Sequence, residues 1–488
     1  MTLRRIPMQY SMQSTSQLFS RGAHQALRVS LFGLALAAVT STASAMSPGG
    51  DLVIEAGRII TQAGGEITDG VIVIRDGRIE AIGAADEVER PWDLNVVGGP
   101  EFTAYPGFVE AHTSGGMDRA NESIDVAPFL NIRDSIDPVS FFFEDVLRNG
   151  ITTLGVHQGN NCVIGARGMV VRPVGRTVEE LMVIGEFGLK LSAAPKSGSS
   201  RATQAQALRV AFDDLKSYLE DSVGERRYDG DKAKREALYQ GRELDEEESK
   251  GRAMGGTAWK VDGLELIPRG ELDVKQRPLL ELVEGNYAAF IYCGAPMDVH
   301  LALEIARDNG FLHRTTLVLD NSCWKAADII AEAGVSVVLD SAMTHIERDP
   351  YTGKEIETVV PRVFADRGVR FALSSNNASS QSLWYQAALA NGLGIERSAA
   401  LDAVTVIPAE ILGLGDRVGS LQVGFDGNVV LSSGDPLSTT SWVEAVVVEG
   451  EQVYDRKTDA RNQHLFEGQT PPVGKQSSMS QGSTGNRR

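Results

Sequence analysis

The stretch Ala288–Ser322, "AAFIYCGAPMDVHLALEIARDNGFLHRTTLVLDNS", contains a complete strand–helix–strand unit. Its two ends are short apolar runs bounded by turn residues, and Val299–Asn309 between them has the apolar spacing of a helix. Two strands joined through a helix predict a parallel pair, because parallel strands need a crossover connection of this length. The stretch therefore indicates an α/β protein.

The same alternation extends from Pro106 to about Pro408. Further strands are predicted in "GITTLGVHQ", "GLKLSAAP", "VSVVLD" and "VRFALSS", with helical stretches such as Ala326–Ala333 between them. So many units in one run predict a (β/α)8 TIM-type barrel over residues 106–408, with an open doubly wound sheet as the alternative. In a barrel the functional residues lie where the strands end at their carboxyl side.

Short strands with glycine turns flank this run on both sides. They occupy Asp51–Val97, where Asp76-Gly77 predicts a hairpin, and Arg417–Tyr454. We expect the two ends of the chain, residues 46–105 and 409–455, to build one composite β-sandwich domain.

Three segments interrupt or extend this plan. The glycine-rich Val163–Gly168, "VIGARG", is interpreted as a loop in the wall of a pocket. Residues from about 200 to 258 begin with an amphipathic helix, Ala202–Leu219, and continue as a charged insert that we expect to be helical and solvated. The tail, residues 456–488, is polar and rich in Ser, Gly and Gln, which predicts disorder.

The first 45 residues resemble a secretory signal peptide. They contain four arginines and no acid, then an apolar run, and then Ala43-Ser44-Ala45. We expect cleavage after Ala45 and a periplasmic or secreted protein, with an N-terminal anchor helix as the alternative. The apolar run is too short to span a bilayer, so no stable membrane insertion is expected after cleavage.

The chain has a formal net charge of −18. Such a surface repels nucleic acid and anionic membranes, so neither is expected as a partner. Three widely spaced cysteines, Cys162, Cys293 and Cys323, do not indicate a disulfide framework.

Four motifs occur in an order that points to one family. They are "YPGFVEAHT" at the start of the barrel, "GITTLGVHQGNNCVIGARG", "GLKLSAAPK", and the closing "DAVTVIPAEILGLGDRVGSLQVGFDGNVVLSSGDP". Together they resemble the amidohydrolase superfamily, in particular its imidazolonepropionase-like and dipeptidase-like members. The resemblance covers about Asp51 to Tyr454. It implies hydrolysis of carbon–nitrogen bonds, in non-peptide or small dipeptide-like amides, by one or two divalent metal ions that activate water.

The sequence departs from the ligand pattern that the resemblance implies. The family has a His-x-His pair after strand 1, a His after strands 5 and 6, and an Asp after strand 8, where it also acts as general base. Serine and asparagine are poor zinc ligands and glycine has no donor atom, so we expect a degraded metal site with His112 as its remnant ligand. The corresponding positions here are His112 and Ser114, then Tyr292 and Gly294, then Asp320, and finally Asn376.

Other residues near the predicted strand ends are further pocket candidates. His157 follows strand 2, and Lys190 is the candidate for the carbamylated lysine that some members carry, with a packed or acid-paired lysine as the alternative. Cys293 and Cys323, together with Cys162 and His112, could form a replacement soft-metal site, with buried structural thiols as the alternative. His112 itself could instead be a partly buried histidine with a backbone partner.

Two functions therefore remain open from the sequence. The first is a hydrolase with an altered site and zinc or another divalent metal. The second is a non-catalytic protein, without a metal cofactor, that binds a small amide-type molecule or forms a hetero-oligomer with an active amidohydrolase relative; a homo-oligomer is expected as the other assembly.

Overall fold

The computed structural model describes residues 49–240, 261, 269–339, 342–375 and 382–467. The predicted signal peptide, most of the charged segment after residue 240, Asn376 and the last 21 residues lie outside this part of the chain. No helix in the described ranges is long and apolar enough to cross a membrane.

The predicted barrel is present as an eight-stranded, nearly closed sheet. Its order is β14-β11-β10-β9-β8-β7-β6-β5. The strands are β5 (Phe108–Thr113), β6 (Ile151–Val156), β7 (Ile164–Val171), β8 (Met182–Ser192), β9 (Ala288–Cys293), β10 (Thr315–Leu319), β11 (Ser336–Leu339) and β14 (Phe371–Leu373).

One strand of the barrel is antiparallel, which corrects the expectation of a purely parallel sheet. Strand β7 pairs antiparallel with both β6 and β8, and the remaining pairs are parallel. It contains most of the stretch that we interpreted as a glycine-rich loop. Its glycines serve close packing: a Cβ on Gly168 would lie 2.4 Å from His157 Nδ1, and one on Gly165 would lie 2.7 Å from Gln158 Oε1.

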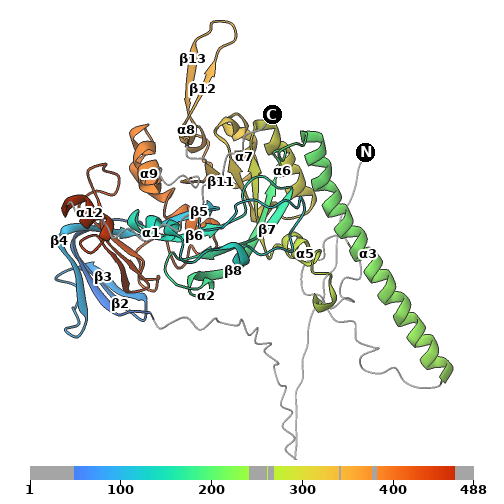
Figure 1. Cartoon of the computed structure of the whole chain (residues 1–488), viewed down its shortest axis with the longest axis horizontal. Helices are drawn as coiled ribbons and strands as arrows, with labels where there is room; N and C mark the ends of the chain where they lie inside the picture. Colours follow the sequence, from blue (N-terminus) through green and yellow to red (C-terminus); the bar gives the residue numbers. More distant parts are fainter. Residues whose placement is uncertain (1–48, 241–260, 262–268, 340–341, 376–381, 468–488) are drawn as a thin grey trace, which may run out of the picture. The chain divides into compact units, whose positions relative to one another are not determined.

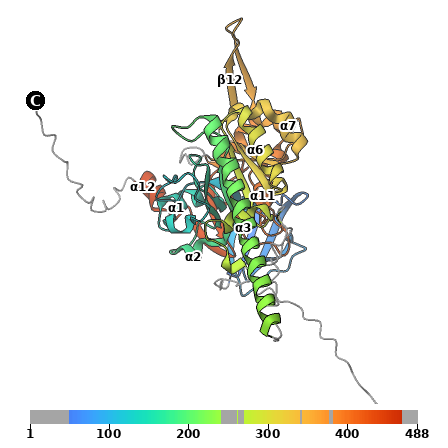
Figure 2. The ribbon, with the colours of Figure 1, turned by 90° about the vertical axis from the view of Figure 1, so that its right-hand side faces the viewer.

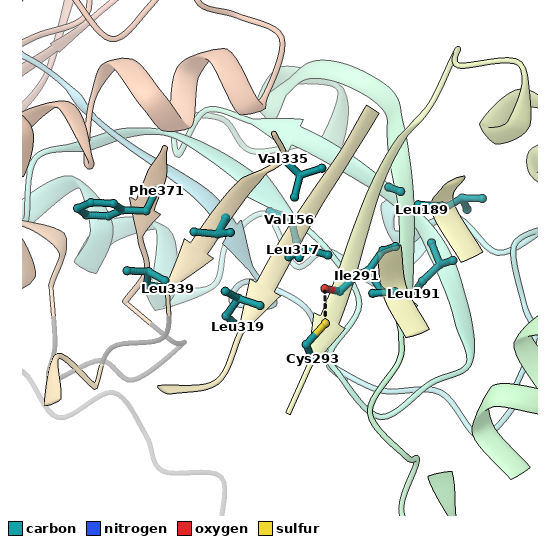
Figure 3. Packing of buried hydrophobic residues seen from close by; sticks show 14 of the residues in the cluster. Val156, Leu189, Leu191, Ile291, Cys293, Leu317, Leu319, Val335, Leu339 and Phe371 are labelled. Atoms are coloured by element: carbon teal, nitrogen blue, oxygen red, sulfur yellow. Dashed lines mark hydrogen bonds between the residues drawn. The ribbon is translucent and has the colours of Figure 1, made fainter. Parts of the chain in front are cut away.

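The barrel strands alternate between an inner and an outer core. Side chains such as Leu191, Ile291 and Leu317 belong to the outer core, which the helices cover, whereas Phe290 and Val318 belong to an inner cluster. Figure 3 shows the outer core, with the thiol of Cys293 donating to the carbonyl oxygen of Ile291 at 3.9 Å.

Helices connect the strands as the βαβ pattern predicts. Helix α6 (Pro296–Asp308) follows β9 and buries Val299, Ala302 and Leu303. The other helices of the barrel are α1 (Phe141–Arg148), α2 (Val178–Leu181), α5 (Arg277–Val283), α7 (Ala327–Ala333), α8 (Val360–Ala365), α9 (Leu383–Gly392), α10 (Arg397–Asp402) and α11 (Val406–Ile411), with 3-10 turns η1 (Ile132–Ser135), η3 (Arg269–Glu271), η4 (Leu312–Arg314) and η5 (Asn321–Ala326).

Two long insertions leave the barrel (Figures 1 and 2). Helix α3 (Arg201–Gln240) has 40 residues; its first half buries apolar side chains including Leu208, Phe212 and Leu215, and its second half is mostly charged and exposed. Strands β12 (Thr344–Arg348) and β13 (Glu355–Val359) form a separate two-stranded hairpin.

Both ends of the chain contribute to a second, seven-stranded sheet. Its order is β17-β16-β15-β4-β1-β2-β3, and Figure 1 shows its blue and red strands, from the two ends of the chain, together in one sheet. The strands are β1 (Leu52–Ile60), β2 (Glu66–Arg75), β3 (Arg78–Ala84), β4 (Asn95–Pro106), β15 (Val429–Ser432), β16 (Val443–Val448) and β17 (Glu451–Asp455). The expected sandwich is thus one continuous sheet, in which strands from both ends share a core that includes Ile54, Ile72 and Leu431.

The first part of the predicted disordered tail is folded. Residues Ala460–Glu467 form helix α12. Before it, the buried carboxylate of Asp459 accepts hydrogen bonds from Arg148 Nε at 2.7 Å and from the backbone N–H of Arg461 at 2.9 Å. The polar composition alone predicted disorder for this segment. Composition does not reveal the partner that anchors the segment, Arg148, because this residue is remote in sequence.

Candidate functional site

A cavity of about 330 Å³ opens at the carboxyl ends of the barrel strands. This is the end at which barrel proteins place their functional residues. Its described lining combines amides and hydroxyls with apolar walls: His112, Ser114, Ala120, Asn121, Gly159, Asn160, Asn161, Tyr292, Val318, Leu319, Val338, Leu339 and Ser374. No Asp, Glu, Lys or Arg belongs to this described lining.

The centre of the site is a contact between a lysine and a histidine. Lys190 Nζ lies 2.8 Å from His112 Nε2, and the contact is buried. Lys190 points into the barrel because its neighbours on β8, Leu189 and Leu191, face the outer core. Lys190 was a candidate for a carbamylated lysine, with a packed or acid-paired lysine as the alternative; in the structure it is a fully buried lysine whose polar partner is His112.

Burial controls the charges of this pair. Desolvation lowers the pKa of Lys190 to about 7, and the Cys162 and Cys293 thiols oppose this shift weakly. Desolvation, with the nearby Lys190 ammonium, holds the pKa of His112 well below its ordinary value. His112 is therefore neutral near pH 7, and in the tautomer with its proton on Nδ1 its Nε2 lone pair accepts a hydrogen bond from Lys190.

His157 lies directly behind this pair. Its ring is stacked on that of His112, with centroids 5.3 Å apart and an interplanar angle of 10°, and it packs on Phe290 at 4.1 Å. The side chain is fully buried, and neither ring nitrogen has a hydrogen-bond partner within the described residues. Desolvation, followed by the Lys190 charge, lowers the pKa of His157 to about 3. It supports His112 from inside and does not line the cavity.

Sequence reasoning missed Glu110, two residues before His112. Its carboxylate is buried and accepts the backbone N–H of Ser375 at 3.2 Å on each oxygen. This interaction joins β5 to the end of β14, which no described backbone ladder connects. Desolvation raises the pKa of Glu110 to about 7, against hydrogen bonds from Ser375 and Ser374. An acid within the wholly buried strand "FVEAHT" was the signal that could have identified it.

The remaining predicted residues divide into lining and structural positions. Ser114 and Tyr292 line the cavity, whereas Gly294 donates its N–H to Asp298 at 3.2 Å beside it. Asp320 caps η5 by accepting the N–H of Ser322 at 3.2 Å, and it is not part of the lining. Asn376 lies outside the described residues.

The three cysteines occupy buried positions with backbone partners. Cys323 Sγ donates to the Cys293 carbonyl at 3.2 Å, and Cys162 Sγ donates to the Gly159 carbonyl at 3.7 Å. Burial raises the pKa of Cys162 to about 11 and that of Cys323 to about 12, and it also raises that of Cys293. Each thiol has a backbone carbonyl as its partner, which favours structural thiols over the replacement metal site.

Comparison with known proteins agrees with the motifs and the fold. A sequence model of the amidohydrolase family matches residues 281–453. These residues, about a third of the chain, are similar to the amidohydrolase family. The crystal structure of an amidohydrolase from Thermotoga maritima MSB8 has the same fold, with a TM-score of 0.65 and 24% identity over 83% of this chain and 100% of that one.

Two curated amidohydrolase relatives match short segments. The amidohydrolase tasK of Hapsidospora irregularis is 31% identical over 96 residues, which are 19% of this chain and 10% of that protein. A dihydroorotase of Anaeromyxobacter dehalogenans (strain 2CP-C) is 46% identical over 63 residues, which are 12% of this chain and 14% of that protein. The chain thus aligns with far less than two thirds of the length of either relative.

The described residues do not fit the divalent metal that the resemblance implies. They contain no group of three or more His, Cys, Asp or Glu side chains able to hold an ion, and a catalytic zinc site normally uses three protein ligands. His112 offers one lone pair, and Lys190 Nζ lies 2.8 Å from it. A zinc ion would need to approach the same nitrogen to about 2.1 Å.

Proposed function

We propose that this protein binds a small organic molecule at the mouth of its barrel and does not carry out metal-dependent hydrolysis. One observation carries the proposal: Lys190 occupies the Nε2 side of His112, the one histidine that remains at a ligand position implied by the resemblance. In its protonated form the Lys190 amine donates hydrogen bonds and accepts none. It can therefore hold His112 in place, but it cannot polarise a water molecule as a divalent ion does.

The cavity lining indicates the chemistry of the ligand. Its amide and hydroxyl groups suit a partner with both donors and acceptors, and apolar residues such as Val318 and Val338 suit a hydrocarbon face. Because the described lining carries no acid and no lysine or arginine, we infer an uncharged, amide-type ligand. A volume of about 330 Å³ lies at the small end of the range for ligand pockets.

Metal content of the full-length protein, purified without chelators or an affinity tag, tests the proposal. Elemental analysis should give far less than one equivalent of zinc, manganese or iron, unchanged by His112→Ala. The exposed His300 provides the matched control, His300→Ala. Turnover of small amides, assayed with and without added zinc or manganese, should remain at the buffer rate.

One equivalent of metal would overturn the proposal if it disappeared in His112→Ala and persisted in His300→Ala. Metal-dependent amide hydrolysis lost with the same substitution would overturn it equally. Either result would restore the hydrolase interpretation with a rebuilt metal site.

A further inference from the structure

A second hollow lies at the opposite end of the barrel strands. It has a volume of about 670 Å³ and is lined where β9, β10 and β11 begin, by residues that include Ala288, Thr316 and Ser336. The mouth cavity instead touches the other ends of these strands, at Tyr292, Leu319 and Leu339. We call this second site the basal hollow, and it is separate from the site of the proposed function.

The basal hollow is rich in positive charge. Arg307, Arg314 and Arg370 line it, and the one acid in the lining, Glu410, forms an ion pair with Arg370. Arg307 and Arg314 have no ion pair with any acid in the described part of the chain. This is notable in a protein with 65 acidic and 47 basic residues, because a cation on such a surface readily finds a carboxylate.

Two helix ends oppose this positive charge. Helices α6 and α7 end beside the hollow, at Asp308 and Ala333, and Arg307 lies in the last turn of α6. A helix C-terminus is equivalent to roughly −0.5 elementary charge, so the two ends contribute about −1. The two unpaired guanidinium groups contribute +2. Among the lining residues, which do not include Asp308, a net positive charge of about one unit therefore remains after the helix ends are counted.

We propose that the basal hollow binds an anionic small molecule that carries phosphate or carboxylate groups. The planar guanidinium groups of Arg307 and Arg314 are suited to two parallel hydrogen bonds with such oxyanions. Thr316 and Ser336 add hydroxyl donors on the same lining. The volume exceeds that of a single phosphate ion and fits a small molecule with several anionic groups.

Isothermal titration calorimetry of the full chain at low ionic strength tests this site, with inorganic pyrophosphate and citrate as probes. The wild type should bind at least one of the two probes at a single saturable site. Tighter binding of pyrophosphate would indicate selectivity for phosphate, and tighter binding of citrate would indicate selectivity for carboxylate. Arg314→Gln and Arg307→Gln should each weaken binding about tenfold. Added salt should weaken binding as well.

Two controls make the result specific. Arg209 is exposed and pairs with Glu304 on α6, so Arg209→Gln removes a nearby charge without touching the hollow. His112→Ala perturbs the mouth and thereby separates this inference from the proposed function. Both variants should bind the probes as the wild type does. The absence of saturable binding by the wild type, or equal weakening by Arg209→Gln, would overturn the inference.

Discussion

Replacement of His157 by phenylalanine is the most direct test of the buried centre. The imidazole is fully buried, and neither nitrogen has a partner in the described structure. A phenyl ring keeps the aromatic stack on His112 and Phe290 and removes both polar atoms. We therefore expect His157→Phe to stabilise the protein, whereas most substitutions at fully buried positions destabilise it.

The magnitude follows from two opposing effects. An unsatisfied buried polar group costs roughly 1–3 kcal/mol, and His157 has two, so their removal contributes about 2–6 kcal/mol. A phenyl ring is larger, and Gly168 packs tightly against the imidazole Nδ1. Overpacking costs about 1–3 kcal/mol. The midpoints of these two ranges give an expected net gain of about 2 kcal/mol in the free energy of unfolding near pH 8.

The gain should increase in acid. The pKa of His157 is about 3 in the folded protein, below its ordinary value of 6.5. Between these values the unfolded chain binds a proton that the folded chain does not. The neutral His157 therefore costs the wild type no stability above about pH 6.5, and the free energy of unfolding decreases as the pH falls toward 3. Each unit costs about 1.4 kcal/mol. His157→Phe lacks this loss, so its advantage should grow by about 2 kcal/mol between about pH 8 and pH 5.

Urea unfolding of both proteins, followed by circular dichroism across this pH range, measures the difference directly. His157→Leu, which is closer to histidine in volume, controls for overpacking. A variant that is less stable than the wild type, with a difference that does not change with pH, would refute the reasoning. The ring nitrogens would then have partners in solution.

Three further outcomes are expected. Lys190→Met removes an amine whose pKa is lowered to about 7. Between about pH 7 and pH 10.5 the unfolded chain binds a proton that the folded chain does not, so the stability of the wild type is lost as the pH falls through this range. The free energy of unfolding of the wild type should therefore rise relative to that of Lys190→Met by about 1.4 kcal/mol per pH unit as the pH increases, as measured by urea unfolding. Glu110→Ala should lose about 2–4 kcal/mol by thermal unfolding, since it leaves the Ser375 N–H unpaired and opens a cavity, whereas Glu110→Gln keeps an acceptor and should lose about 1. Asp459→Asn should release α12, seen as faster proteolysis after residue 455 at a loss of about 1–3 kcal/mol in local stability; equal protection in the variant and the wild type would contradict the anchoring role.

The sequence predicts the barrel well because its signals are local. The run of apolar strands and intervening helices identified β6, β8, β9, β10, β11 and β14 without tertiary information. The first part of strand β7, up to Gly168, was interpreted as a loop for a non-local reason. Its Gly165 and Gly168 have the composition of a loop, and only the packing of Gln158 and His157 against them explains why glycine is required in a strand.

The sequence indicated which residues lie near the site but not which of them contact one another. His112, His157 and Lys190 were each identified from a predicted strand end, but spacing along the chain does not reveal that Lys190 and His112 share a hydrogen bond. Glu110 was overlooked because its partner, the Ser375 N–H, lies 265 residues later, just after β14. Pairings between strands that are remote in sequence depend on the closed barrel, and they therefore require the structure.

The pairing of the two chain ends has a consequence for biosynthesis. Strand β4 pairs with β15, which the ribosome makes more than three hundred residues later, as the link between Ser432 and Thr103 shows. Until β15 to β17 have been made, β4 has an unpaired edge, and unpaired edges promote association between nascent chains. Folding of this sheet must therefore be completed after synthesis of the barrel, and loop closure over such a separation is expected to be slow. A nascent chain that stops before Val429 would have no means of protecting that edge.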